Sequence, residues 1–172
     1  MRPRWLGSRA NVAVAVRTAS VCLASYLAGT WFTSLFHAGS TVIGGVWSVV
    51  SGILVLQATL EDTRGSAMLR VLGTFIGAAV AAIYLVLFRF HPLGMAVTVG
   101  VTVLVCQALR VPDHARLASV TVVIVLAVSV ADPAIRPVLN ALLRFAESCI
   151  GAGIATLAVY LSPGARRPAI TG

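Results

Sequence analysis

The stretch from Trp47 to Gly77, WSVVSGILVLQATLEDTRGSAMLRVLGTFIG, contains the features that decide the fold. An apolar run that holds a Trp ends at Gln57, a short charged turn follows, and a second apolar run opens at Arg70. Runs of this kind, separated by a short charged turn, are typical of neighbouring transmembrane helices. The rest of the chain shows whether this pattern continues.

The composition of the whole chain indicates lipid as its solvent. Of its 172 residues, 59% are hydrophobic and only 10% are charged, and the mean hydropathy is +0.97. Soluble domains carry about 25% charged residues, so a chain this apolar would expose large apolar patches in water. We therefore expect one compact membrane domain and no second, soluble domain.

Apolar stretches recur along the chain, interrupted by charge, Pro or Gly. Each is close to the about 17–25 residues that a spanning helix needs, although the fifth is short. Some runs are rich in Val and favour strands, but an isolated strand in lipid cannot satisfy its backbone, so helices are expected. The sequence predicts an all-α integral membrane protein with six transmembrane helices, at Thr18–Phe36, Thr41–Gln57, Val71–Phe88, Leu93–Leu109, Leu117–Ala131 and Ala141–Leu161.

The first apolar stretch follows several arginines, as a signal peptide would. Its apolar run is longer than that of a signal peptide and five more stretches follow, which favours an uncleaved first helix. The predicted organisation is a cytoplasmic segment at 1–17, a membrane domain at 18–161 and a cytoplasmic tail at 162–172.

The basic residues give the predicted helices an orientation. The formal net charge is +8, and all 13 basic residues are Arg. No nucleic-acid-binding motif accompanies them, so we expect no nucleic acid as a partner. With both termini in the cytoplasm, ten arginines lie inside and three outside, which is the positive-inside bias of a bacterial inner-membrane protein. Trp31, Phe32 and Phe36 then mark the outer interface, and Trp5 marks the inner one.

A weak internal repeat relates two of the predicted helices. The segment 70–81, RVLGTFIGAAVA, matches 144–155, RFAESCIGAGIA, at five identical positions. Three crossings separate the copies, so they would have opposite orientations, as in the inverted three-helix repeats of many transporters. Matches of this kind also arise by chance in a chain rich in Ala, Gly and Ile.

The central stretch resembles the fusaric acid resistance and aromatic acid exporter superfamily, which is related to the aluminium-activated malate transporters. The matching residues are Trp47, Leu56-Gln57, Thr63, Arg64, Arg70, Gly73, Thr74 and Gly77, and Arg144 with Glu147 also fits the family. Ala58 departs from the pattern, because the family usually has Pro there. The resemblance covers about residues 18–161 and implies a six-helix membrane module; many members carry two such halves and soluble domains, so a homodimer is expected.

Charged and polar residues at membrane depth are the candidate site residues. An ionisable residue there is costly and marks function by default, and an Arg guanidinium can bind a carboxylate through two hydrogen bonds. The candidate substrate-binding residues are Arg17, Trp47, Gln57, Arg70, Thr74 and Arg144. As alternatives, Arg70 reaches the lipid phosphates, and Arg144 forms an ion pair with Glu147, three residues on.

Two further roles are expected within the helices. Glu147 is the acidic residue expected inside a helix, and it is the candidate proton carrier if transport is coupled to protons; Glu61, Asp62, Asp113 and Asp132 are expected in loops. Small residues four apart allow helix backbones to approach closely, so Gly73, Gly77 and Gly151 are the candidate packing residues.

Catalysis and metal binding find no support in the sequence. His37, His91 and His114 lack a second ligand at metal spacing, and no Ser or Thr stands beside an evident base. The three cysteines lie singly in apolar segments, where Cys usually acts as a small hydrophobe. We therefore expect a protein that is not an enzyme and has neither a cofactor nor a metal.

The resemblance implies the function, which is export of small organic, especially aromatic, carboxylate anions across the bacterial inner membrane. Lipid and the organic anion are then its partners. Two alternatives remain open: a channel-like anion conduit, and a membrane subunit or scaffold that transports nothing.

Overall fold

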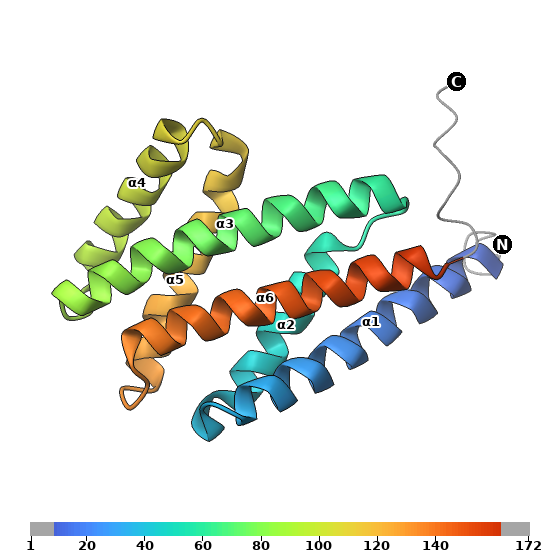
Figure 1. The fold of residues 1–172 in the computed structure, drawn as a ribbon, viewed down its shortest axis with the longest axis horizontal. Coiled ribbons are helices and arrows are strands. Elements are labelled where there is room, and N and C mark those ends of the chain that lie inside the picture. Colours follow the sequence, from blue (N-terminus) through green and yellow to red (C-terminus); the bar gives the residue numbers. More distant parts are fainter. Residues whose placement is uncertain (1–8, 163–172) are drawn as a thin grey trace, which may run out of the picture.

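The computed structural model describes residues 9–162, with side chains from residue 11 onward. This part of the chain forms six α-helices and two short 3-10 helices, and it contains no strand. In chain order they are α1 (Arg9–Ser34), η2 (Ala38–Ser40), α2 (Thr41–Val55), α3 (Leu60–Leu87), α4 (Pro92–Ala108), η3 (Pro112–His114), α5 (Ala115–Ala131) and α6 (Pro137–Tyr160) (Figure 1). The prediction of an all-α fold with six helices is confirmed.

Five of these helical segments are long and apolar enough to cross a membrane, and α4, with 17 residues, is shorter. A 17-residue helix still reaches the lower limit of spanning length. α5 also has 17 residues, and the flanking residues of η3 extend it to a helical segment of 20 residues, Pro112–Ala131. The chain is a multi-pass membrane protein.

The start of α3 differs from the expectation. Thr59 caps this helix, since its hydroxyl oxygen accepts from the backbone N–H of Asp62 at 3.1 Å. Glu61 and Asp62 lie in the first turn, where negative charge stabilises the helix dipole. The prediction that these two acids lie in a loop is wrong, and Arg70 does not open the helix but follows Leu60 by ten residues. The apolar pattern hides this start because the first turns of α3 are polar.

The helices run up and down, so the start of α1 and the end of α6 lie on the same side of the bundle (Figure 1). We call this side the proximal side, and the opposite side, on which α1 ends and α6 begins, the distal side. Of the proposed segments at 1–17 and 162–172, residues 1–8 and 163–172 lie outside the described residues, and with them Arg2, Arg4, Trp5, Arg166 and Arg167. Within the described range, α1 already begins at Arg9, ahead of the predicted boundary at 18.

The helices pack in a pattern that relates the first three to the last three. α3 and α6 lie against each other at the centre and run in opposite directions (Figure 1). α6 packs on α2 as α3 packs on α5, and α1 packs on α2 as α4 packs on α5. This is the contact pattern of two inverted three-helix units, in agreement with the weak sequence repeat.

Candidate functional site

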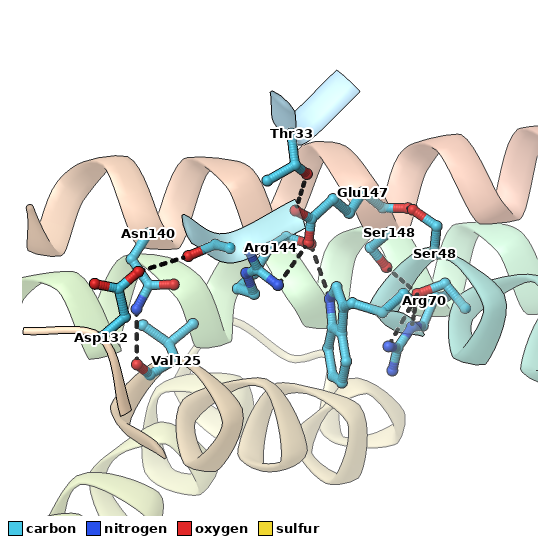
Figure 2. Close-up of polar contacts among 12 residues, drawn as sticks. Thr33, Ser48, Arg70, Val125, Asp132, Asn140, Arg144, Glu147 and Ser148 are labelled. Carbon is cyan, nitrogen blue, oxygen red and sulfur yellow. Dashed lines mark hydrogen bonds and ion pairs between the residues drawn. The ribbon is translucent and has the colours of Figure 1, made fainter. Parts of the chain in front are cut away.

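Polar side chains gather in the middle of the bundle, where α1, α2, α3 and α6 meet (Figure 2). They are buried, with Trp47 the most exposed of them at 5%. Buried polar groups at membrane depth are costly unless they are satisfied or used. We call this cluster the polar core; its members are Thr33, Trp47, Ser48, Ser51, Arg70, Thr74, Arg144, Glu147 and Ser148.

Arg144 and Glu147 form the distal half of the polar core. Their side chains are fully buried, and Nη1 of Arg144 lies 2.9 Å from Oε2 of Glu147. The other carboxylate oxygen accepts from the hydroxyl of Thr33 at 2.6 Å. Nη1 of Arg144 has this carboxylate as its ion-pair partner, whereas Nε and Nη2 of Arg144 lack a hydrogen-bond acceptor in the described structure.

Arg70 forms the proximal half. Its Nε and Nη2 donate to the Ser51 hydroxyl oxygen at 3.2 and 3.1 Å. The guanidinium lies over the ring of Trp47, 4.6 Å from the ring centroid, which is a cation–π contact. Nη1 has no hydrogen-bond partner in the described part of the chain, and with 1% exposure the side chain does not reach lipid phosphates.

Trp47 and the small hydroxyl side chains connect the two arginines. The indole N–H of Trp47 donates to the backbone carbonyl of Arg144 at 2.9 Å. The hydroxyl of Ser51 lies 3.1 Å from that of Ser148, which in turn lies 3.1 Å from that of Thr74. The polar core is therefore a continuous network that joins its two halves across α2, α3 and α6.

The charges of the polar core do not balance. Among the described residues, the charged side chains with less than 2% exposure are Arg70, Arg144 and Glu147. Two guanidinium groups thus face one carboxylate, and three guanidinium nitrogens outside the ion pair lack acceptors within the described residues. Buried charge is expensive without a partner, and a carboxylate is the group that a guanidinium binds best. The polar core is suited to hold one further anion.

A cavity connects the polar core with the proximal side. Its volume is about 430 Å³, and it is lined by residues of α2, α3, η3 and α5, among them Arg70, Asp113 and Arg116. A larger groove of about 620 Å³ lies between α3 and α4, but apolar side chains on the outer surface dominate its lining and none belongs to the polar core. We assign the larger groove to lipid and the smaller cavity to the site.

Glycines bring the helices close enough for these contacts. A Cβ on Gly73 would lie 2.9 Å from Cβ of Leu117, and one on Gly77 would lie 2.9 Å from the carbonyl carbon of Ala118, so both glycines pack against α5. Gly151 packs in the same way against α2, at Gly52. Close approach through small residues is how helices associate in lipid.

The structure brings most of the predicted site residues together and leaves two apart. Arg70, Thr74, Arg144, Trp47 and Glu147 meet in the polar core. Arg17 and Gln57 lie instead at the proximal end, where Nη2 of Arg17 donates to the backbone carbonyl of Gln57 at 3.3 Å. The side chain of Gln57 is exposed.

Sequence reasoning missed the hydroxyl groups that complete the network. Ser48 and Ser51 on α2 are fully buried, as is Thr33 on α1. A signal for α2 was present, because Gly44, Ser48 and Ser51 recur at the spacing of one helix face. On α1, Ser25, Gly29 and Thr33 recur four residues apart in the same way, and this signal was also missed.

Comparison with known proteins places this site in a family. The model of fusaric acid resistance protein-like domains matches residues 29–158, which include the whole polar core. The UPF0421 protein OB2406 of Oceanobacillus iheyensis is 26% identical over 119 residues, which are 69% of this chain and 33% of that protein. The chain thus spans about a third of the length of this relative. No solved structure matches the chain significantly. The chain belongs to the fusaric acid resistance protein-like family.

Proposed function

We propose that this membrane domain exports small organic carboxylate anions, aromatic ones above all, across the bacterial inner membrane. The observation that carries the proposal is the surplus of buried positive charge: Arg70 and Arg144 are buried with Glu147 as their carboxylate, and three of their nitrogens lack acceptors within the described residues. One bound carboxylate would balance the charge and accept from these nitrogens. Fusaric acid, which gives the family its name, is itself an aromatic carboxylic acid.

The cavity at Arg70 supplies the entrance in this proposal. Arg116 and Arg70 both line it and would attract an anion toward the polar core. Because the arginine bias assigns the proximal side to the cytoplasm, the anion enters from the cytoplasm. The membrane potential, negative inside, favours its exit by about 2.3 kcal/mol per charge for each 100 mV.

Glu147 has a second role in the proposal. A substrate carboxylate at Arg144 competes with Glu147 for the same guanidinium, so protonation of Glu147 would free Arg144 for the substrate. Glu147 is thus the residue through which protons would act on transport. Thr33, which donates to Glu147, holds its carboxyl group in place.

We propose further that the domain works as a homodimer in the inner membrane, with both termini in the cytoplasm. Lipid covers its outer surface, on which large apolar side chains such as Trp31, Leu104 and Leu157 are more than half exposed. Arg17 and Gln57, at the proximal end, would contact the anion only on its way to the cavity.

Reconstitution into proteoliposomes tests the function. We expect vesicles that contain the purified protein to release trapped benzoate faster than protein-free vesicles, with malate as the aliphatic comparison. A current that is linear in voltage and insensitive to a pH gradient would favour a channel-like conduit. Failure to move any acid of a wider panel, under any gradient, would contradict the proposal and favour a scaffold.

A further inference from the structure

The inverted packing gives each position near Arg70 a counterpart near Arg144. Adding 74 to a residue number of α3 gives its counterpart on α6, as in the sequence repeat: Arg70 corresponds to Arg144, and Gly77 to Gly151. The packing partners extend this relation to α2 and α5, since Gly77 lies against the backbone of Ala118 and Gly151 against that of Ser48. Adding 70 to a residue number of α2 therefore gives its counterpart on α5.

The two arginines differ in what surrounds them. The cavity on the proximal side reaches Arg70, and its lining includes the partly exposed residues Ser66, Leu69 and Leu117. Their counterparts on the distal side are Asn140, Leu143 and Trp47, which are 0%, 2% and 5% exposed. The same place in the fold is thus open at one end and closed at the other.

Trp47 is the side chain that closes the distal counterpart. It stands where the proximal cavity has the smaller Leu117, and its indole N–H is bonded to the backbone carbonyl of Arg144. On α6, the buried Oδ1 of Asn140 and the Nε and Nη2 of Arg144 have no hydrogen-bond partner within the described residues. An unpartnered acceptor and unpartnered donors, one turn apart on α6, suit an occupant that is absent from the closed form.

We propose that Asn140, Leu143, Arg144 and Trp47 form a second carboxylate-binding port, which opens to the distal side when the proximal cavity closes. The port rests on the proposed transport function for its ligand. In the open form it has the shape that the proximal cavity has here, with Arg144 in the place of Arg70. The two three-helix units exchange conformations. The substrate therefore contacts Arg70 from the proximal side and Arg144 from the distal side.

Thiol labelling tests the port without any need for transport. In a background with the three native cysteines replaced by Ala, Leu69→Cys reports the proximal cavity and Leu143→Cys its distal counterpart. The reagent is a charged, membrane-impermeant methanethiosulfonate, applied to spheroplasts for the outer side and to inverted vesicles for the inner side. Leu142→Cys, at a position 58% exposed toward lipid, is the matched control and should stay unreactive.

The structure predicts rapid labelling of Leu69→Cys from the inner side and slow labelling of Leu143→Cys from the outer side. Exchanging the two side chains, by Trp47→Leu together with Leu117→Trp, should reverse this labelling pattern. Because a minor state of at most about 10% becomes dominant, labelling of Leu143→Cys should rise at least about fivefold. If the exchanged protein does not fold, the protein with wild-type Trp47 and Leu117 is measured under a benzoate gradient instead. The labelling rate of Leu143→Cys should then rise.

Two results separate this inference from the proposed function. Benzoate flux with Leu143→Cys unreactive in both measurements would overturn the port and leave the transport function standing. Reversed labelling with no flux of any acid would support two alternating openings and overturn the transport function.

Discussion

At the scale of single residues, the ion pair of Arg144 and Glu147 is the costliest element of the polar core. Both side chains are fully buried, and Thr33 is the further hydrogen-bond donor to the carboxylate. A buried pair of this kind adds little net stability, but removal of one partner leaves the other charge without compensation. Its presence is therefore better explained by function than by stability.

Replacement of one or both partners of the ion pair separates its net stabilisation from the cost of a buried charge without a partner. We expect Arg144→Met to lower the free energy of unfolding by about 3 kcal/mol, and the double variant with Glu147→Met to recover most of that loss. Unfolding in mixed micelles titrated with dodecyl sulfate measures both. Asp132→Asn is the control, because its pair with His37 spans 3.5 Å and is about 20% exposed, and it should cost less than about 1 kcal/mol. A double variant no more stable than the single one would show that the pair itself stabilises the fold.

The position of Glu147 beside Arg144 also predicts that anion binding depends on pH. Since protonation of Glu147 would release Arg144, benzoate should bind more tightly as the pH falls, and Glu147→Gln should remove this dependence. Isothermal titration of the detergent-solubilised protein with benzoate, over a range above the acid's own titration, measures it. An equal pH dependence in both proteins would exclude Glu147 as the proton carrier.

How far the sequence predicts the site depends on the kind of residue. Charged residues in apolar segments are rare, so Arg70, Arg144 and Glu147 could be singled out by type alone. Ser and Thr recur along these helices, and their hydroxyl can donate to a backbone carbonyl of the same helix, as that of Thr102 does to the carbonyl of Thr98. Small residues four apart, Ser25, Gly29 and Thr33, indicate the packed face of α1, but the hydrogen bond from Thr33 to Glu147 required the structure.

At the scale of the helices, glycines set the distance between α6 and α2. A Cβ on Gly151 would lie 2.8 Å from the backbone N of Gly52, whereas one on Gly153 would meet nothing within 4 Å. Backbone atoms cannot move aside as a flexible side chain can, so α6 would have to shift. This contact holds Ser148 and Arg144 against α2.

Alanine substitution at these two glycines is a matched test on one helix. We expect Gly151→Ala to destabilise the protein by about 1–3 kcal/mol through overpacking. Gly153→Ala should be neutral or stabilising by up to about 1 kcal/mol, because Ala favours the helix. Thermal unfolding followed by size-exclusion chromatography ranks the variants, and equal midpoints would contradict the packing described here.

The number and approximate positions of the helices follow from apolar segments, but their ends do not. Hydropathy marks only the part of a helix that lies in lipid, so the polar start of α3 with its Thr59 cap was not recognised. At α1 the reason is different: residues 12–16 are apolar, but Arg17 interrupts the apolar residues, so the predicted boundary at Thr18 lies inside the helix that begins at Arg9. Helix ends in water depend on capping and not on hydropathy.

At the scale of the whole molecule, two three-helix units of opposite orientation enclose a polar core that carries surplus positive charge. Sequence alone suggested this arrangement through five matching positions, and the packing of α3 on α5 and of α6 on α2 follows it. One half is open to the proximal side and the other is closed by Trp47. This difference between equivalent halves is what a transporter with alternating access requires.

The central claim is that the two buried arginines bind the transported anion. Benzoate efflux from proteoliposomes that contain Arg70→Gln, Arg144→Gln or Arg64→Gln tests it most directly, once each protein is shown to insert and remain monodisperse. Arg64 is the control, because it lies on α3 and is exposed. Loss of a charge-assisted hydrogen bond worth about 1.5–3 kcal/mol predicts a fall of about 10- to 100-fold for Arg70→Gln and Arg144→Gln and no change for Arg64→Gln. Unchanged efflux in both core variants would contradict the claim.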